Sequence, residues 1–190
     1  MGKDMEHLVE PSQEKKEAIH AIYKEIFKRK EPLNSDYQKK AQSLMTYLFA
    51  WENWSWRVEG ISKKAFEQIT GQKSGSLSKG LVRHHFLEGG RSKTYNDLLS
   101  GNEPLSLEEF FQYFWERDRT VILTRNEHDT EKNINGLKVM RLDWKEGYFQ
   151  NSGLIGFKVR KNTEREYLSG LSDEQQEWLE IRSLLPNPNI

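Results

Sequence analysis

The chain has 190 residues, 31% of them charged, and its formal net charge at pH 7 is zero. Cysteine is absent, which excludes a disulfide scaffold, a thiolate zinc site and a cysteine nucleophile. No apolar run approaches the roughly 20 residues that a membrane-spanning helix requires, and the first residues lack the apolar stretch of a signal peptide. We therefore expect one soluble, cytoplasmic domain over residues 1–190, without a membrane partner.

The N-terminal part predicts two helices. Apolar residues recur at helical spacing over residues 12–30 and again over residues 35–54. The "KEPLN" between the two runs is typical of a helix end followed by a turn. The pattern therefore predicts a helical hairpin, in which His20 falls off the apolar stripe and is expected on the surface.

Aromatic and charged residues meet at the end of the second helical run. Trp51, Trp54 and Trp56 lie within six residues and are followed by Arg57 and Glu59. The tryptophans can form a packing cluster at a helix end, or they can form a platform on which nucleic-acid bases stack. The arginine and the glutamate can likewise be a buried pair or residues of a site.

Residues 57–93, which we call the basic tract, hold eight basic and three acidic side chains, whereas the rest of the chain beyond them is acidic on balance. The basic tract contains a short predicted helix that begins after Ser62. A Ser/Gly/Lys loop over residues 71–80 follows, and it lacks the spacing of a Walker loop. A polyanion would be attracted to this tract. The expected nucleic-acid-binding residues are Lys63, Lys64, Lys73, Lys79, Arg91 and Lys93.

The central part predicts two strands, each followed by a helix. "LVRHHF" over residues 81–86 and the β-branched run over residues 120–124 are typical of short strands. Capping boxes predict the start of a helix over residues 106–117 and of another over residues 124–135. The second of these capping boxes pairs the N-cap threonine with Glu127.

The C-terminal part predicts a β-hairpin and a helix. Residues 137–144 and 154–160 read as strands, and residues 172–185 read as a terminal helix that "PNPN" ends. The expected fold is α+β, with an N-terminal helical hairpin, a ββα-like centre with a small antiparallel sheet, and a C-terminal helix. Within the single domain, the three parts cover residues 1–70, 71–136 and 137–190.

The predicted central part contains several residues that can bind a metal ion. His84 and His85 end its first strand, and Asn126, His128 and Asp129 lie at the start of the helix that follows its second strand. Imidazole together with carboxylate or amide oxygen can hold magnesium, manganese, nickel or zinc. Phosphodiester hydrolysis needs such a cation and a base for the attacking water, and one histidine of the pair could be that base.

"RHH" followed by "VILTRNEHDTEKNINGL" resembles the HNH, or ββα-metal, nucleases over residues 81–136. Before the second strand, where that family usually carries Asn-Leu, this chain has "DRT" at residues 118–120. The resemblance implies a hydrolase that cleaves nucleic acid, with DNA as the expected partner, in the manner of a restriction-type or phage-type endonuclease. By this resemblance the metal ligands are His84, His128 and the alternative ligand Asn126, and the catalytic residues are the general base His85 and its neighbour Arg83.

Two alternatives remain open from the sequence. Consecutive residues of a strand point to opposite faces, so the histidine pair can be one buried and one exposed structural residue. The chain can also be a non-catalytic adaptor or inhibitor that binds nucleic acid or a protein through the basic tract and the tryptophans. The convergence of His85 and His128 on one point would distinguish the nuclease from these alternatives.

Overall fold

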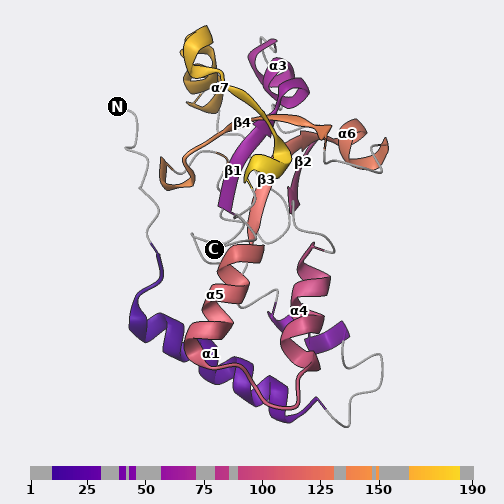
Figure 1. Ribbon diagram of the computed structural model, residues 1–190, viewed down its shortest axis with the longest axis vertical. Coiled ribbons are helices and arrows are strands. Elements are labelled where there is room, and N and C mark those ends of the chain that lie inside the picture. The colour runs from indigo at the N-terminus through magenta and orange to yellow at the C-terminus, as the bar shows by residue number, and fades with distance from the viewer. Residues whose placement is uncertain are drawn as a thin grey trace.

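The computed structural model describes residues 10–30, 39–41, 43–45, 57–71, 80–85, 90–130, 136–146, 149 and 163–184 (Figure 1). The protein is α+β, as predicted, and residues 39–41 and 43–45 are helical in addition to the labelled elements. The labelled helices are α1 (Gln13–Lys28), α3 (Lys63–Gly71), α4 (Gly90–Ser100), α5 (Leu107–Arg117), α6 (Arg125–Thr130) and α7 (Thr163–Ser169). The strands are β1 (Arg57–Ser62), β2 (Leu81–His85), β3 (Arg119–Thr124), β4 (Lys138–Arg141) and β5 (Trp178–Glu180), and the short 3-10 helices are η2 (Trp144–Glu146), η3 (Asp173–Gln175) and η4 (Ile181–Leu184).

The described strands form one sheet in the order β2-β3-β1-β4-β5. The expected small antiparallel sheet is wrong in one respect, because β1 and β3 run parallel while the other neighbours run antiparallel. The sequence did not indicate β1, since its charged start directly follows a helical pattern. The β1–β3 register shifts between Val58 and Gly60, and the extra residue, Glu59, leaves the regular ladder.

Both faces of the sheet are covered by apolar side chains. One face carries Val58, Ile61 and Ile122, which pack with residues of α3 and α7 in one cluster. The opposite face carries Val121 and Val139, which pack in another cluster with residues of η4. Strand alternation explains the division, since adjacent residues of β3 enter different clusters.

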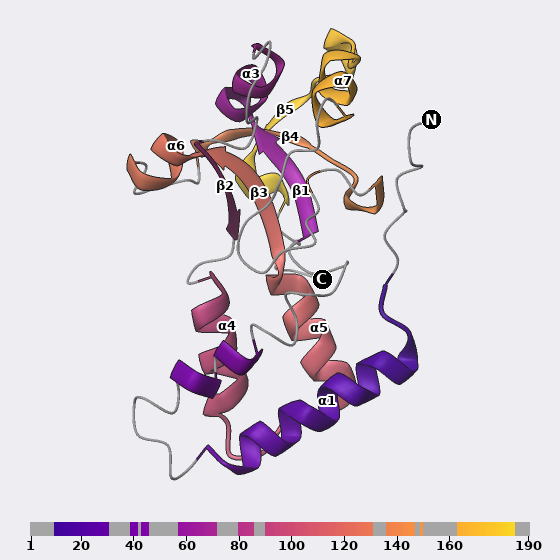
Figure 2. The same cartoon turned by 180° about the vertical axis from the view of Figure 1, so that it is seen from behind.

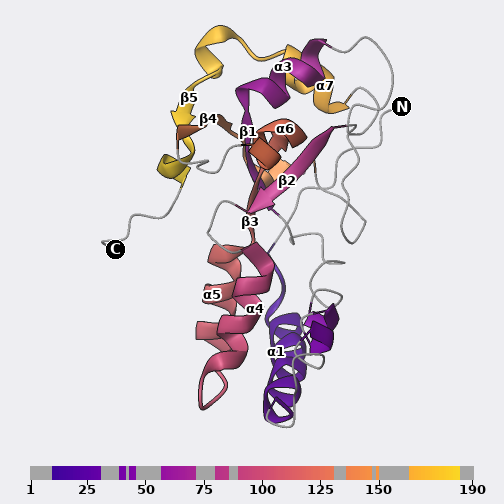
Figure 3. The same ribbon diagram turned by 90° about the vertical axis from the view of Figure 1, so that its right-hand side faces the viewer.

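A second core lies between helices at one end of the sheet (Figures 2 and 3). Helices α1, α4 and α5 enclose it, and Met45 of the second predicted helix joins them. Tyr23 stacks on Phe110 with ring centroids 4.4 Å apart and donates a hydrogen bond to the Leu98 carbonyl at 2.9 Å. The prediction of an exposed His20 is wrong, because the residue is buried at 8% exposure. Its Nε2 lies 2.8 Å from the Leu105 carbonyl oxygen.

The prediction of a terminal helix over residues 172–185 is also wrong. Its start forms only the single turn η3, which Ser172 and Gln175 cap reciprocally. The chain then becomes extended because β5 pairs antiparallel with the outer side of β4. Edge pairing in the sheet thus overrides the helical pattern. The predicted strand over residues 154–160 lies outside the described residues.

Candidate functional site

Strand β2 forms one edge of the described sheet and carries the histidine pair. It pairs antiparallel with β3, so that His84 is opposite Val121 and His85 is opposite Thr120. Helix α6 follows β3 without a loop, and its first residue, Arg125, donates a backbone hydrogen bond to the Gly80 carbonyl just before β2. The two strands and the helix that follows them are therefore joined at their shared end.

A buried carboxylate fixes the start of α6, as the predicted capping box required. Glu127 is 2% exposed and accepts hydrogen bonds from the Thr124 backbone N–H and hydroxyl, both at 2.9 Å. It also accepts one at 2.7 Å from the Ser62 hydroxyl, which caps α3 through the Ala65 N–H. The N-terminal ends of α3 and α6 are thereby tied to each other across the sheet.

The structure brings His84 and His128 together. Their ring centroids are 5.2 Å apart and the rings meet edge to face. Burial, reinforced by repulsion from His128 and then from His85, lowers the pKa of His84 to about 4. His84 is therefore neutral at physiological pH and has a lone pair for a metal ion. The His128 side chain is 41% exposed, and its Nδ1 lies 3.0 Å from Asp129 Oδ1.

His85 lies on the opposite face of β2 and does not converge with His128. Successive residues of a strand point to opposite faces, so His85 shares a face with Arg83 and Thr120 instead. Its Nε2 lies 3.2 Å from Oδ1 of Asp118. The two side chains are 7% and 1% exposed, so the contact is shielded from water.

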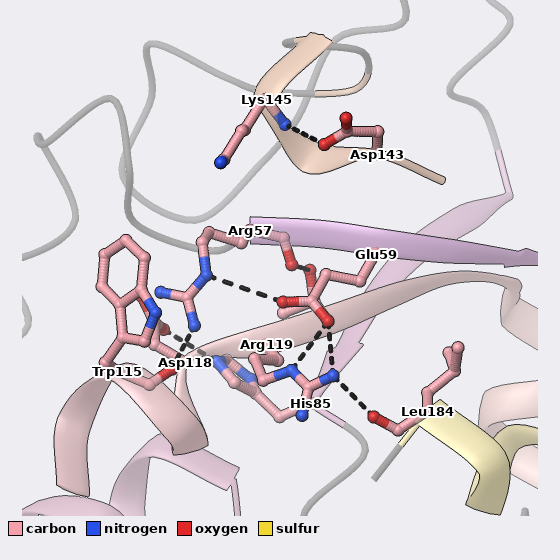
Figure 4. A network of polar contacts seen from close by, with 10 residues as sticks. Arg57, Glu59, His85, Trp115, Asp118, Arg119, Asp143, Lys145 and Leu184 are labelled. Atoms are coloured by element: carbon pink, nitrogen blue, oxygen red, sulfur yellow. Dashed lines mark hydrogen bonds and ion pairs between the residues drawn. The ribbon is translucent and has the colours of Figure 1, made fainter. Parts of the chain in front are cut away.

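Next to this contact lies a network of charged residues (Figure 4). Arg57 is 1% exposed, and its guanidinium covers the Trp115 ring at 3.6 Å from the ring centroid and donates to the Trp115 carbonyl. Its Nε lies 3.6 Å from Glu59 Oε1, and Arg119 Nη2 lies 2.6 Å from Glu59 Oε2. Arg57 and Glu59 are thus the buried pair that was one of the two possibilities left open by the sequence.

Burial lowers the pKa of Arg57, while attraction to Asp118 and then to Glu59 raises it. The network therefore depends on both carboxylates to keep its buried cation. Sequence reasoning missed Asp118 and Arg119 as site residues. The alternation of charges in "WERDR" directly before an apolar strand was the available signal.

The other predicted residues are distributed over the surface. Asn126 is exposed on α6, and Lys63 and Lys64 are exposed at the start of α3. Lys93 forms an ion pair with Asp97 at 2.6 Å. The residues Lys73 and Lys79, the side chain of Arg91, and Trp51, Trp54 and Trp56 lie outside the described part of the chain.

The donor set at His84 and His128 fits a divalent metal ion in part. Two imidazoles are suitable ligands for zinc, nickel or manganese, whereas Asn126 lies two residues before His128 on α6, a spacing that directs the two side chains to different sides of the helix. Within the described ranges, no group of three or more histidine or acidic side chains is arranged to hold a metal. An ion at this pair would therefore complete its coordination with water or with oxygens of a substrate.

Comparison with known proteins finds no family model that matches the chain, no similar curated protein and no similar solved structure. None of the helices in the described ranges has the length and apolar character needed to cross a membrane.

Proposed function

We propose that the protein is a metal-dependent nuclease that hydrolyses DNA phosphodiester bonds by HNH-like chemistry. The observation that carries the proposal is the meeting of His84 and His128, from a strand and from the helix after its antiparallel neighbour. The chain passes from β2 to β3 and α6, with α4 and α5 inserted between the two strands, and this order supports the ββα arrangement that the resemblance implies. In this proposal, helices α1, α4 and α5 and the C-terminal strand β5 are additions around that centre.

In this proposal His84 and His128 hold the divalent ion, with Asn126 as the alternative ligand to His128. Magnesium, manganese, nickel and zinc are the candidate ions, and the two imidazoles favour the last three. When bound, the ion stabilises negative charge on the phosphate and leaving-group oxygens. The low pKa of His84 supports this role, because only a neutral imidazole can bind a metal.

His85 is the general base of the proposed reaction. It takes a proton from a water molecule, whose oxygen then attacks phosphorus while the bond from phosphorus to the leaving oxygen breaks. The leaving oxygen takes up a proton from solvent, so the number of protons is unchanged. Repulsion from His85 contributes to the lowered pKa of His84, so the two rings interact electrostatically although they lie on opposite faces of β2.

A cleavage assay tests the proposal. The full chain is incubated with supercoiled and linear DNA in the presence of each candidate ion, and separately with EDTA. We expect cleavage that EDTA abolishes, and a decrease of about 10²–10⁴-fold for His85→Ala, because a positioned base contributes that much to rate. His20→Gln is the matched control, since it keeps a donor for the Leu105 carbonyl far from the site. Equal cleavage by His85→Ala and wild type contradicts the assignment of His85.

A second candidate function is non-catalytic binding of nucleic acid or of a protein. The observation that favours it is that His85 does not converge with His128, the criterion that would have distinguished the nuclease, and that the His85 side chain is only 7% exposed. Under this alternative the wild type binds DNA in a salt-dependent manner without cutting it in any of the four metals. Salt-independent capture of a partner would instead indicate a protein ligand.

A further inference from the structure

Arg125 is an exposed arginine close to the candidate metal ligand His128. It is the first residue of α6 and lies three positions before His128. Residues three apart on a helix lie on the same side of it, with their Cβ atoms about 5–6 Å apart. The ring of His128 meets that of His84 and is itself 41% exposed. The long side chain of Arg125 can therefore reach a ligand that is bound beside these two rings.

The fold does not use the positive charge of Arg125. Within the described ranges its guanidinium forms no hydrogen bond or ion pair, and only its backbone N–H is engaged, by the Gly80 carbonyl. Two acidic residues of α6 lie near it along the chain. Glu127 is buried and accepts hydrogen bonds from hydroxyl and backbone N–H groups, and Asp129 contacts Nδ1 of His128 at 3.0 Å. The guanidinium is therefore available to an anionic ligand.

A second exposed cation lies at the same end of the sheet. Strands β1 and β3 are parallel neighbours, and each continues directly into a helix, β1 into α3 and β3 into α6. The first residues of these helices, Lys63 and Arg125, are both exposed. The hydrogen bond of 2.7 Å from Ser62 to Glu127 fixes the two helix starts to each other. Figure 1 shows α3 and α6 at the end of the molecule opposite to α1. One nucleic-acid strand, which carries a phosphate at every nucleotide, can therefore contact both cations.

We propose that Arg125 binds a backbone phosphate of the DNA strand next to the phosphate at the ion of His84 and His128, and that this strand continues from α6 toward Lys63. The inference rests on the proposed function, because it names how the substrate of that site is held. The formal net charge of the chain is zero, so locally placed cations have to attract the DNA. A guanidinium binds a phosphate through two parallel hydrogen bonds, which fix the orientation of the strand in addition to neutralising its charge.

Binding without cleavage gives the first test. The affinity of the full chain for a labelled DNA duplex is measured by fluorescence anisotropy in EDTA over a series of salt concentrations. We expect Arg125→Ala to lower the slope of log K against log salt by about 0.9, because one phosphate contact is lost. Arg125→Lys keeps the charge and should retain the slope. Arg29→Ala is the matched control, since it removes the same exposed charge from the C-cap of α1 at the opposite end of the molecule (Figure 1).

Two outcomes of the binding test overturn the inference. An unchanged slope in Arg125→Ala excludes Arg125 from the DNA surface and leaves the proposed nuclease intact. An equal decrease in Arg125→Ala and Arg29→Ala shows a general effect of charge rather than a contact. A slope that depends on Arg125, together with no cleavage by the wild type in any candidate ion, supports the phosphate contact and overturns the proposed nuclease. The two proposals can therefore fail separately.

Steady-state cleavage in the presence of an active ion gives the second test. A phosphate next to the cleaved one keeps its charge throughout the reaction, so Arg125 should bind the substrate and the transition state equally. We therefore expect Arg125→Ala to raise KM by about threefold or more while kcat changes by less than about threefold, whereas His128→Ala lowers kcat. A decrease of kcat in Arg125→Ala without a change of KM overturns the inference, because Arg125 would then act on the cleaved phosphate itself.

Discussion

The imidazole of His84 meets that of His128 edge to face, with ring centroids 5.2 Å apart. One ring belongs to an edge strand and the other to the helix that follows the neighbouring strand, so the contact depends on tertiary structure. Two further features of the structure support this contact. Glu127 ties the start of α6 to Ser62, and burial keeps His84 neutral.

The first prediction concerns metal binding by this pair. An ion that binds only the folded protein stabilises it by about 2.7 kcal/mol at a free concentration of 100 times Kd. We expect the Tm of the wild type at pH 7.5 to rise with nickel, zinc or manganese, and the rise to disappear in His128→Ala. Differential scanning fluorimetry with each ion and with EDTA measures it, and His20→Gln should behave as the wild type. A Tm that no ion changes, or an equal response of His128→Ala, shows that the pair is not a metal site.

The second prediction concerns acid stability of the metal-free protein. The folded pKa of His84 is about 4 and that of an unfolded histidine is about 6.5, so between these values the unfolded chain binds more protons. The free energy of unfolding is therefore highest above pH 6.5 and falls as the pH drops toward 4. The full effect would be about 1.4 kcal/mol per pKa unit, but solvent screens part of it, and we expect a loss of about 1–2 kcal/mol.

Urea unfolding in EDTA at several pH values from 7 to 4 measures this loss. His84→Gln is the comparison that isolates one group, because the carboxylates of the protein also titrate in this range. The difference in unfolding free energy between wild type and variant should shrink or reverse as the pH falls. A difference that stays constant from pH 7 to pH 4 contradicts the assigned pKa.

The third prediction concerns Glu127 as the anchor of α6. Glu127→Ala leaves the Ser62 hydroxyl and the Thr124 N–H in a buried region without their acceptor, and each such group costs about 1–3 kcal/mol. We expect a loss of about 2–4 kcal/mol in unfolding free energy by chemical denaturation. Glu109→Ala removes the equivalent glutamate of the exposed capping box on α5 and should cost clearly less. Equal losses in the two variants would contradict the structural role of Glu127.

Local sequence patterns correctly predicted the helices whose starts are fixed by neighbouring residues. The capping boxes of α5 and α6 were visible as Ser106 with Glu109 and Thr124 with Glu127, and both form. The sequence did not indicate α4 or α7. The helical pattern over residues 172–185 does not predict β5, because the pairing of β5 with the edge strand β4 is not visible in a local pattern.

The meeting of His84 and His128 was predicted from the order of elements along the chain, although the contact itself joins distant segments. The ββ pairing and the helix after it place His84 and His128 together, and those elements are local in pattern. The partner of His85 could not be predicted, because Asp118 reaches it through the docking of α5 onto the sheet. The sequence left open whether Arg57 is buried in a pair or belongs to a site, and its burial follows from the parallel pairing of β1 with β3, which joins distant segments.

The fourth prediction concerns Arg57. Arg57→Ala removes the buried cation that attracts Glu59 and Asp118. It also leaves a cavity next to the Trp115 ring. Breaking a buried charge pair by removing one partner typically costs about 3–5 kcal/mol, so we expect a loss of that size in unfolding free energy. Arg141→Ala is the matched control, because Arg141 is exposed and contacts only the Ser183 carbonyl among the hydrogen bonds described here. A loss below about 1 kcal/mol would show that the network contributes little to stability.

The last prediction concerns contacts with phosphates. Lys63 and Lys64 are exposed next to each other at the start of α3, and Lys93 on α4 forms an ion pair with Asp97 at 2.6 Å. Each lysine that neutralises a phosphate of duplex DNA contributes about 0.9 to the slope of log K against log salt. We therefore expect the double variant Lys63→Ala/Lys64→Ala to lower that slope by about 1.8, and Lys93→Ala to change it much less. Fluorescence anisotropy with a labelled duplex in EDTA, over a series of salt concentrations, measures binding without cleavage. Equal slopes for the wild type and the double variant would exclude these two lysines from the DNA-binding surface.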